Sequence, residues 1–387
     1  MLHRLDCSVQ HYPWGGRSAD GRPPYIADLL GLADDGGKPW AELWIGAHPK
    51  LPARLPEAGG QPLDQWLQAH PVAAGSAGLP FLMKVLDSAA ALSIQAHPDK
   101  ALAVKLRARS PEHYPDANHK PEIALALSRV SAFCGFRRER SIRADSVRLP
   151  GLGRFLSGVR GQDWLRGAYA RIFTATAIEV AKTLQVLEAE VRTLPRPTPR
   201  DRWFLKLLAQ YPGDRGTLCA WFLNLMTLRP GQALFIPANE PHAYLEGTMV
   251  ECMASSDNVV RGGLTNKFID RDVLLNMLSY QQGRPVVQAG KALPTGGRIY
   301  QVPADEFRLE LWEQGTARRI HEANRQLSLL LILEGEAEFA IGLQKVKAPR
   351  GSIWLWPAND PRLEFRPLVP GTVVVRAAPA DEEMASC

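Results

Sequence analysis

The stretch GQALFIPANEPH at residues 231–242 recurs in similar form as GSIWLWPANDPR at residues 351–362. Each copy reads glycine, five mostly apolar residues, and then Pro-Ala-Asn, an acidic residue and a second proline. The apolar residues are typical of a buried strand, and the proline and asparagine predict the turn that ends it. Asparagine is the non-glycine residue that best tolerates a positive φ. Two copies in one chain therefore predict two related β-barrels.

The first copy ends in a histidine. The spacing G-x5-P-x-N-x2-H resembles the second motif of the cupin superfamily, whose double-stranded jelly roll carries a metal ion inside a barrel. The second copy has Arg362 where the first has His242, and arginine cannot bind a cation. His321 is the only histidine after His242. We therefore expect any metal in the first barrel and a metal-free second barrel.

His242 needs partners from earlier in the chain. The tripeptide Gln95-Ala96-His97 offers two, because alternation along a strand turns its outer residues to the same side. His119-Lys120-Pro121-Glu122 offers two more. Nitrogen and oxygen ligands without a thiolate suit a catalytic divalent ion better than a closed structural zinc site. The alternative is ordinary packing, the commoner role of a lone histidine in a strand, which we expect for His3, His11, His70 and His113.

The hydrophobic pattern divides the chain into three parts. Residues 1–140 predict short strands and turns with a helix or two, and residues from about 226 onward predict mainly strands. Between them, Ile178, Leu184, Leu187, Val191 and Leu194 indicate a helical segment with a proline-rich hinge at 194–199. We expect a mainly β protein with two cupin-type jelly-roll barrels and a small α-helical domain. The expected bounds are 1–145 with 226–280 for the catalytic barrel, 146–225 for the helical domain and 281–387 for the C-terminal barrel.

Composition sets the class of protein. The 387 residues are 45% hydrophobic and 22% charged, values of a globular chain long enough for two or three domains. The net charge of +6 is spread without long runs, and no motif indicates nucleic-acid binding. The five cysteines form no C-x-x-C pair, and no stretch resembles a signal peptide or a membrane span. We expect a cytoplasmic protein that acts on a small molecule, with no membrane or nucleic-acid partner.

A longer set of motifs resembles one enzyme family. The strings YPWGG, AELWIGAHP, LPFLMKVLDSAAALSIQAHPDK, NHKPEIALAL, FCGFR, IPANEPHAYLEG and VECMASSDNVVRGGLTNKF occur in order across residues 12–268. Together they resemble type I mannose-6-phosphate isomerase, also called phosphomannose isomerase. The resemblance implies reversible interconversion of mannose 6-phosphate and fructose 6-phosphate through a cis-enediol(ate). It also implies a role in carbohydrate metabolism, either in supplying GDP-mannose or in mannose breakdown.

The resemblance also implies the residues of the site. It implies one Zn²⁺ per chain, in the first barrel, bound by Gln95, His97, Glu122 and His242. It implies a catalytic role for Arg261, whose permanent charge suits either the enediolate oxygens or the phosphate. The polar residues that match segments lining the family's pocket are Lys84, Ser93, Lys100, Asp257, Asn258 and Lys267.

The identity of the catalytic base stays open at this point. We favour Glu251 in V-E-C-M as the base, because a buried carboxylate has a raised pKa. Lys120 and His48 are competitors, also for ring opening or for moving the hydroxyl proton, and Glu251 could instead orient a ligand. Trp14 resembles the family's pocket-rim tryptophan, and Glu42 is a weaker candidate.

Two departures and two other classes of protein bear on this interpretation. Gly262 and Asn266 stand where the family usually has alanine and proline, and HPKLPAR follows a different pattern after His48; both bear on loop rigidity and substrate selectivity. An iron dioxygenase would more usually offer two histidines and a carboxylate without glutamine. A non-catalytic sugar-binding cupin would have lost ligands. We therefore expect a monomeric isomerase that binds a sugar phosphate.

Overall fold

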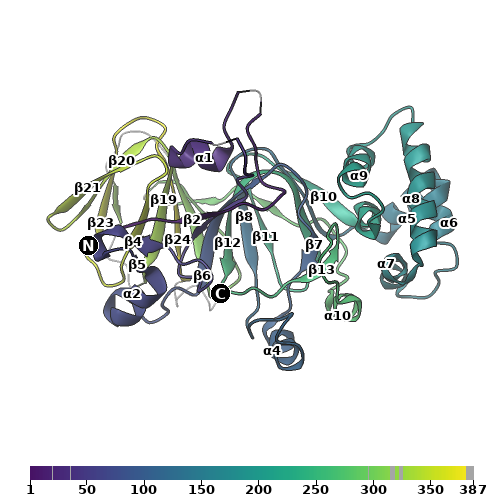
Figure 1. Cartoon of the computed structure of the whole chain (residues 1–387), viewed down its shortest axis with the longest axis horizontal. Helices are drawn as coiled ribbons and strands as arrows, with labels where there is room; N and C mark the ends of the chain where they lie inside the picture. The colour runs from purple at the N-terminus through teal and green to yellow at the C-terminus, as the bar shows by residue number, and fades with distance from the viewer. Residues whose placement is uncertain (20, 35, 295, 314–318, 322–325, 381–387) are drawn as a thin grey trace.

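The computed structural model of the chain describes residues 1–19, 21–34, 36–294, 296–313, 319–321 and 326–380, with only the backbone described for 319–321. The molecule is mainly β-sheet with several helices. Two C-terminal sheets lie at one end, a large sheet lies in the middle, and helices α5 to α9 lie at the other end (Figure 1). In the described residues, no helix combines the length and apolar character that a membrane crossing requires.

The central sheet is built around one long strand, β12. Its main path runs β14-β11-β8-β12-β6-β3-β2, and β7, β9, β10 and β13 join through β12. The second half of β12 pairs with β6 and β8, whereas its first residues pair with β7 and β9. Gly247 lies at the change of partners with φ +118°, and a Cβ there would lie 2.6 Å from the carbonyl oxygen of Arg129. The strand therefore connects two groups of strands.

The central sheet and the elements beside it agree with the predicted mix of short strands, turns and a few helices. The strands of the central sheet are β2 Ser8–Gln10, β3 Glu42–Ile45, β6 Phe81–Ser88, β7 Ile94–Ala96, β8 Glu122–Ala126, β9 Val130–Phe136, β10 Leu223–Leu228, β11 Ala233–Ile236, β12 His242–Ala254, β13 Val260–Gly263 and β14 Val287–Gln288. A small hairpin, β4 Arg54–Leu55 and β5 Gln61–Pro62, lies beside them. The helices outside the helical segment are α1 Tyr25–Leu30, α2 Leu63–Ala69, α3 Pro71–Ala74, α4 Lys100–Arg109 and α10 Arg271–Met277.

Both copies of the repeated stretch form a strand and a turn, as predicted. The apolar residues become β11 in the first copy and β22 in the second. Asn239 has φ +63° and Asn359 has φ +59°, the left-handed conformation that asparagine tolerates. The chain leaves the first turn directly into β12, which begins at His242. Arg362 is exposed, whereas His242 is fully buried.

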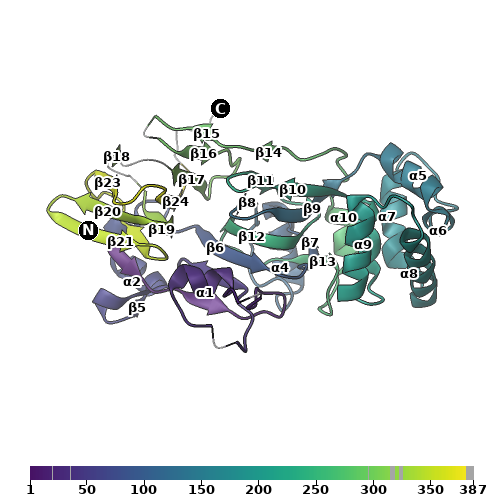
Figure 2. The same cartoon turned by 90° about the horizontal axis from the view of Figure 1, so that it is seen from above.

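The C-terminal half, meaning the described residues from 281 onward, contains strands and no helix, in agreement with the predicted strand pattern. A seven-stranded sheet has the order β1-β22-β19-β24-β17-β16-β15, and a four-stranded sheet has the order β18-β23-β20-β21. Its strands are β15 Lys291–Ala292, β16 Arg298–Tyr300, β17 Arg308–Glu313, β18 Arg319–His321, β19 Ser328–Glu334, β20 Glu336–Ile341, β21 Gln344–Pro349, β22 Ile353–Trp356, β23 Leu363–Pro367 and β24 Val373–Ala378. Figure 2 shows the segment with β14 to β16 running from the central sheet to these sheets.

Alternate residues of the seven-stranded sheet face two different cores. Leu329, Leu331 and Val375 pack with residues of the central sheet, such as Met83 and Val250. Leu330, Ile332 and Val374 pack instead against Phe339 and Phe365 of the four-stranded sheet. Because side chains alternate along a strand, one sheet joins the two halves on one face and closes the C-terminal half on the other.

The first strand of the chain belongs to this C-terminal sheet. β1, His3–Leu5, is antiparallel to β22, with His3 opposite Leu355 and Leu5 opposite Ile353. Leu2 packs into the C-terminal core, and Leu5 packs into the core shared by the two halves. The two ends of the sequence therefore share a sheet.

The predicted helical segment forms five α-helices and a 3-10 turn. Their bounds are α5 Glu139–Arg148, α6 Pro150–Phe155, α7 Trp164–Thr174, α8 Ala177–Arg192, α9 Pro199–Gln210 and η2 Arg215–Trp221. The proline-rich hinge separates α8 from α9, and Thr198 caps α9 through a capping box with Asp201. Ile178 lies in the first turn of α8 and is 82% exposed, and the buried stripe of this helix begins at Val180.

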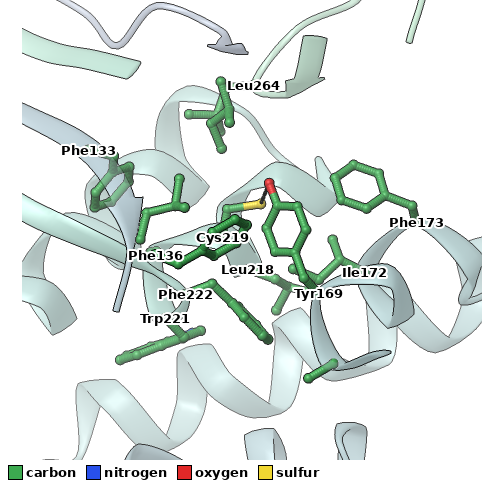
Figure 3. Close-up of a cluster of buried hydrophobic side chains, with 14 of the residues drawn as sticks. Phe133, Phe136, Tyr169, Ile172, Phe173, Leu218, Cys219, Trp221, Phe222 and Leu264 are labelled. Carbon is green, nitrogen blue, oxygen red and sulfur yellow. Dashed lines mark hydrogen bonds between the residues drawn. The ribbon is translucent and has the colours of Figure 1, made fainter. Parts of the chain in front are cut away.

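An aromatic core attaches the helices to the central sheet. Phe133 and Phe136 of β9 lie in one buried cluster with Tyr169 of α7 and Phe222 after η2 (Figure 3). The Cys219 thiol lies 3.6 Å from the Tyr169 hydroxyl. This core supports β9, which pairs with the first residues of β12.

Candidate metal centre and active site

Three strand ends bring His97, Glu122 and His242 together. His97 follows β7, Glu122 begins β8 and His242 begins β12. His97 Nε2 lies 3.4 Å from Glu122 Oε1, and His242 Nε2 lies 3.2 Å from Glu122 Oε2. All three side chains are fully buried, and their nearest ligand atoms lie within 4.8 Å of one another. In the described part of the chain, this is the one such group of histidine, cysteine and carboxylate side chains.

The two imidazoles are oriented by backbone carbonyls. His97 Nδ1 lies 2.7 Å from the carbonyl oxygen of Asn258, and His242 Nδ1 lies 3.0 Å from that of Glu240. A neutral ring that donates from Nδ1 directs its Nε2 lone pair into the cluster. Burial lowers the pKa of His97 to about 4, which keeps this ring neutral.

The electrostatics of the cluster fit a divalent cation. Although burial opposes it, Lys120 and His97 hold the pKa of Glu122 well below its usual range. The Nε2 atoms of His97 and His242 and the Oε2 atom of Glu122 are buried without a hydrogen-bond partner among the described residues, whereas Glu122 Oε1 forms an ion pair with Lys120. Buried polar atoms are normally satisfied, so three such atoms converging on one point indicate a cation-binding site. One ionised carboxylate and two neutral imidazoles can hold that ion.

Gln95 lies directly beside this cluster. Its backbone is paired with His242 on one side and with Arg261 on the other. The side chain is half-buried. Gln95, the predicted fourth ligand, and Arg261, the predicted catalytic arginine, are therefore neighbours in one small group of strands. The role of Gln95 as a ligand stays a prediction.

Arg261 is a half-buried cation that forms no ion pair with a carboxylate among the described residues. No ion pair or hydrogen bond joins its guanidinium to another described residue, and burial lowers its pKa. An arginine nonetheless stays charged at neutral pH. An unpaired guanidinium beside the metal cluster suits an anionic ligand.

A buried chain of charged groups lies on the neighbouring strands. Lys84 Nζ is 3.3 Å from Glu251 Oε2 and 3.6 Å from Glu42 Oε2. Lys120 Nζ is 2.9 Å from Glu122 Oε1. Burial and the negative charge of Glu122 raise the pKa of Glu251, while Lys84 opposes the increase. A carboxylate with a raised pKa is suited to proton transfer.

Asp257 contacts an imidazole and an ammonium group at the edge of the site. Its Oδ2 lies 3.4 Å from His48 Nε2 and 2.7 Å from Lys50 Nζ. Although burial opposes it, these two contacts lower the pKa of Asp257. His48 is also edge-on to Trp44, whose indole donates to Glu42. These contacts join the loop that contains His48 to the loop that contains Asp257.

The remaining residues predicted to contact the substrate are not gathered around the metal cluster. The Asn258 amide group donates to the Asp116 and Asn118 loop instead of pointing to an open site. Lys100 is exposed and pairs with Glu306, at 2.9 Å. The others are Trp14, which stacks on Tyr12, Ser93, which is half-buried before β7, and Lys267, which is exposed after β13.

Three further residues organise these groups and were not predicted from the sequence. Asp116 accepts hydrogen bonds from the loop that contains Asp257 and Asn258. Lys50 pairs with Asp257, and Glu306 pairs with His119 and Lys100. Lys50 lies in the HPKLPAR departure, which was a usable signal. Asp116 and Glu306 had no such signal, because their partners are distant in the sequence.

The sheet architecture and the buried histidine–carboxylate cluster define a metal-binding protein built mainly of β-sheet, and comparison with known proteins gives its family. Residues 2–139 match the model of the phosphomannose isomerase type I catalytic domain. Mannose-6-phosphate isomerase of Homo sapiens is 39% identical over 400 residues, which cover 92% of this chain and 93% of the human protein. Mannose-6-phosphate isomerase 1 of Arabidopsis thaliana is 35% identical, covering 92% and 90%. The chain belongs to the type I phosphomannose isomerase family.

Solved structures agree with this assignment. A zinc-bound mannose 6-phosphate isomerase has a TM-score of 0.87 at 28% identity, over 98% of this chain and 100% of that one. A point mutant of phosphomannose isomerase from Salmonella typhimurium has a TM-score of 0.89 at 28% identity, again over 98% and 100%. The likeness therefore extends over both halves and the helical segment.

Proposed function

We propose that this chain is a zinc-dependent mannose-6-phosphate isomerase that interconverts mannose 6-phosphate and fructose 6-phosphate. The observation that carries the proposal is the convergence of buried ligand atoms from His97, Glu122 and His242, three of which have no hydrogen-bond partner among the described residues. Gln95 is the proposed fourth ligand, because it pairs with His242 across adjacent strands. A bound Zn²⁺ supplies a Lewis acid that polarises hydroxyl and carbonyl oxygens of the sugar.

The proposed base is Glu251. It removes the proton from C2 of the open-chain aldose and returns it to C1, while the hydroxyl proton moves from O2 to O1 through a cis-enediol(ate). The raised pKa of Glu251 supports this role, because a carboxylate that binds the proton more tightly is a better base. Lys84 lies 3.3 Å away and holds the carboxylate in place.

Other side chains are assigned to the oxygens of the sugar. Lys120 and His48 are the candidates for ring opening and for moving the hydroxyl proton. Arg261 is proposed to stabilise the negative charge of the enediolate or of the phosphate, because its guanidinium is unpaired among the described residues. The other proposed substrate contacts are Trp14, Lys84, Ser93, Lys100, Asp257, Asn258 and Lys267.

We further propose a three-part organisation. The central sheet corresponds to a catalytic jelly-roll barrel formed by residues 1–145 and 226–280, residues 146–225 form a helical domain, and residues 281–387 form a second jelly-roll barrel. The alternation of the two cores along β19 and β24 supports this division. Both the metal and the substrate belong to the first barrel. We propose that the enzyme acts as a monomer, in the cytoplasm where sugar phosphates are metabolised.

Conversion of fructose 6-phosphate to mannose 6-phosphate by the purified protein tests the proposal. The assay is run before chelation, after chelation and after zinc is added back. Activity that is lost and then restored supports reaction, substrate and metal together. A zinc-loaded protein without conversion would contradict the proposed reaction, and activity restored by ferrous iron but not by zinc would contradict the proposed metal.

A further inference from the structure

Asp116 joins two loops that are far apart in the sequence. Its Oδ1 accepts hydrogen bonds from the Asn118 amide (2.9 Å), the Ser256 hydroxyl (2.8 Å) and the Asn258 side-chain amide (3.0 Å). Its Oδ2 accepts one from the Asp257 backbone amide, at 2.8 Å. A carboxylate that receives four such bonds holds its donors in one geometry, because bonds to an ionised acceptor are the stronger ones.

Asn258 transmits this geometry to a metal ligand. Its side chain is fully buried, and its amide nitrogen also donates to the backbone oxygens of Asp116 and Asn118, at 2.8 and 2.9 Å. The backbone oxygen of the same residue lies 2.7 Å from His97 Nδ1. Fixing the side chain of Asn258 therefore fixes the carbonyl that orients the His97 ring.

The same loops lead to other groups of the site. Four residues after Asn118 the chain reaches Glu122, and three residues after Asn258 it reaches Arg261 on β13. Short segments of chain thus connect the loops held by Asp116 to Glu122 and Arg261, and the Asn258 carbonyl connects them to His97. Asp116 itself touches none of these three side chains.

We propose that Asp116 is a positioning residue that sets the metal affinity of the site by holding the Asn258 carbonyl against His97. The inference rests on the proposed zinc site and concerns metal binding rather than turnover. Loss of a partner that orients a ligating histidine costs about 10- to 100-fold in metal affinity. Asp116→Asn keeps the size of the side chain and removes the charge and one acceptor.

Zinc affinity of the purified full chain provides the test, by competition with a chromogenic chelator. We expect the Kd for zinc to rise about 10- to 100-fold in Asp116→Asn and by less in Ser256→Ala, which removes one donor to Asp116. Asp272→Asn is the matched control, because Asp272 is 77% exposed and pairs only with its neighbour Arg271 among the described residues. Its Kd should equal that of the wild type.

A second readout separates positioning from loss of the fold. In zinc-free protein, the ¹⁵N shifts of the His97 ring report the tautomer, which we expect to be protonated at Nδ1 in the wild type and mixed in Asp116→Asn. If Asp116→Asn does not fold, Ser256→Ala carries the test through the same two measurements. An unchanged Kd and tautomer in the folded variant, beside tight zinc binding in the wild type, would overturn the role of Asp116 alone. A wild type that binds no zinc would overturn the metal site together with this inference.

Discussion

Glu306 Oε1 lies 2.6 Å from His119 Nε2. Glu306 precedes β17 in the C-terminal half, whereas His119 belongs to the NHKPE stretch that ends at Glu122. The same oxygen is 2.9 Å from Lys100 Nζ. The C-terminal half therefore supplies a carboxylate to two cationic or polar side chains beside the metal cluster.

This contact predicts a dependence of stability on pH. His119 and Lys100 outweigh the effect of burial and lower the pKa of Glu306 from 4.5 to about 2. Because the folded pKa is lower than the unfolded one, the stabilisation is complete above pH 4.5 and is lost as the pH falls toward 2. Its size is on the order of 1–2 kcal/mol after screening by solvent is taken into account.

Glu306→Gln tests this expectation. Urea midpoints of the wild type and the variant are measured over a pH series, and we expect the advantage of the wild type to shrink below pH 4.5. A difference that stays constant down to the acid limit would show that the contact is not ionic.

The two copies of the repeated stretch offer a matched pair for metal binding. His242→Ala removes a buried ligand and is expected to abolish stoichiometric zinc binding, because the ion needs every ligand of an open site. Arg362→Ala alters the equivalent position of the second copy, which is exposed, and should leave the zinc content unchanged. Metal analysis of the purified proteins decides. Full zinc in His242→Ala would contradict the site.

Arg261 is expected to act on the reaction and not on the metal. Arg261→Ala should lower kcat on the order of 100-fold, because a charge that stabilises the transition state is lost, while zinc content and thermal midpoint stay the same. Arg271→Ala removes an exposed arginine ten residues away and is the control. Wild-type rates in Arg261→Ala would rule out a catalytic role.

Glu251 is tested by Glu251→Gln. If it is the base, kcat falls about 100- to 10,000-fold while zinc remains bound. The alternative, in which Glu251 only orients neighbouring groups, predicts weaker zinc binding with a smaller loss of turnover. Rates measured with zinc in excess, together with zinc Kd values, separate the two outcomes.

The positive φ of the two turn asparagines predicts a pattern of stability. Asn239→Ala and Asn359→Ala should each lower the free energy of unfolding by about 1–2 kcal/mol, because a residue with a plain Cβ is strained there. Asn359→Gly should cost the least, because the hydrogen bond that the Asn359 side chain donates to the backbone oxygen of Val72, at 3.1 Å, is exposed to solvent. Asn239→Gly should still cost stability, because the Asn239 side chain also donates to Asp99, at 3.0 Å. Urea unfolding of the four variants provides the comparison.

Local patterns predicted what local forces determine. The turn at Asn239, the hinge before Pro199 and the helical insertion follow from the conformational preferences of neighbouring residues, and the structure has all three. The metal cluster could be predicted because strand alternation and the motif spacing indicate which side chains converge.

Contacts between distant segments could not be predicted in this way. The bonds of Asp116 to residues 256–258 and of Glu306 to His119 depend on how loops meet after the sheets have formed. From the sequence alone, an aspartate or glutamate in a loop with distant partners cannot be distinguished from one that contacts only water. The pairing of β1 with β22 is similar, because a three-residue strand gives no indication of its partner.

That pairing constrains how the chain is made. His3 opposes Leu355, so β1 has no partner in this sheet until the ribosome has translated β22, which is distant in the sequence. Leu2, whose core partners all lie between Trp312 and Val374, must stay exposed to water, or to a chaperone, throughout this period, whereas Leu5 can contact Leu55 earlier. We expect β1 to become resistant to protease only after β22 has left the ribosome. A bulky fusion at the N-terminus would then delay the last step of folding more than one attached elsewhere.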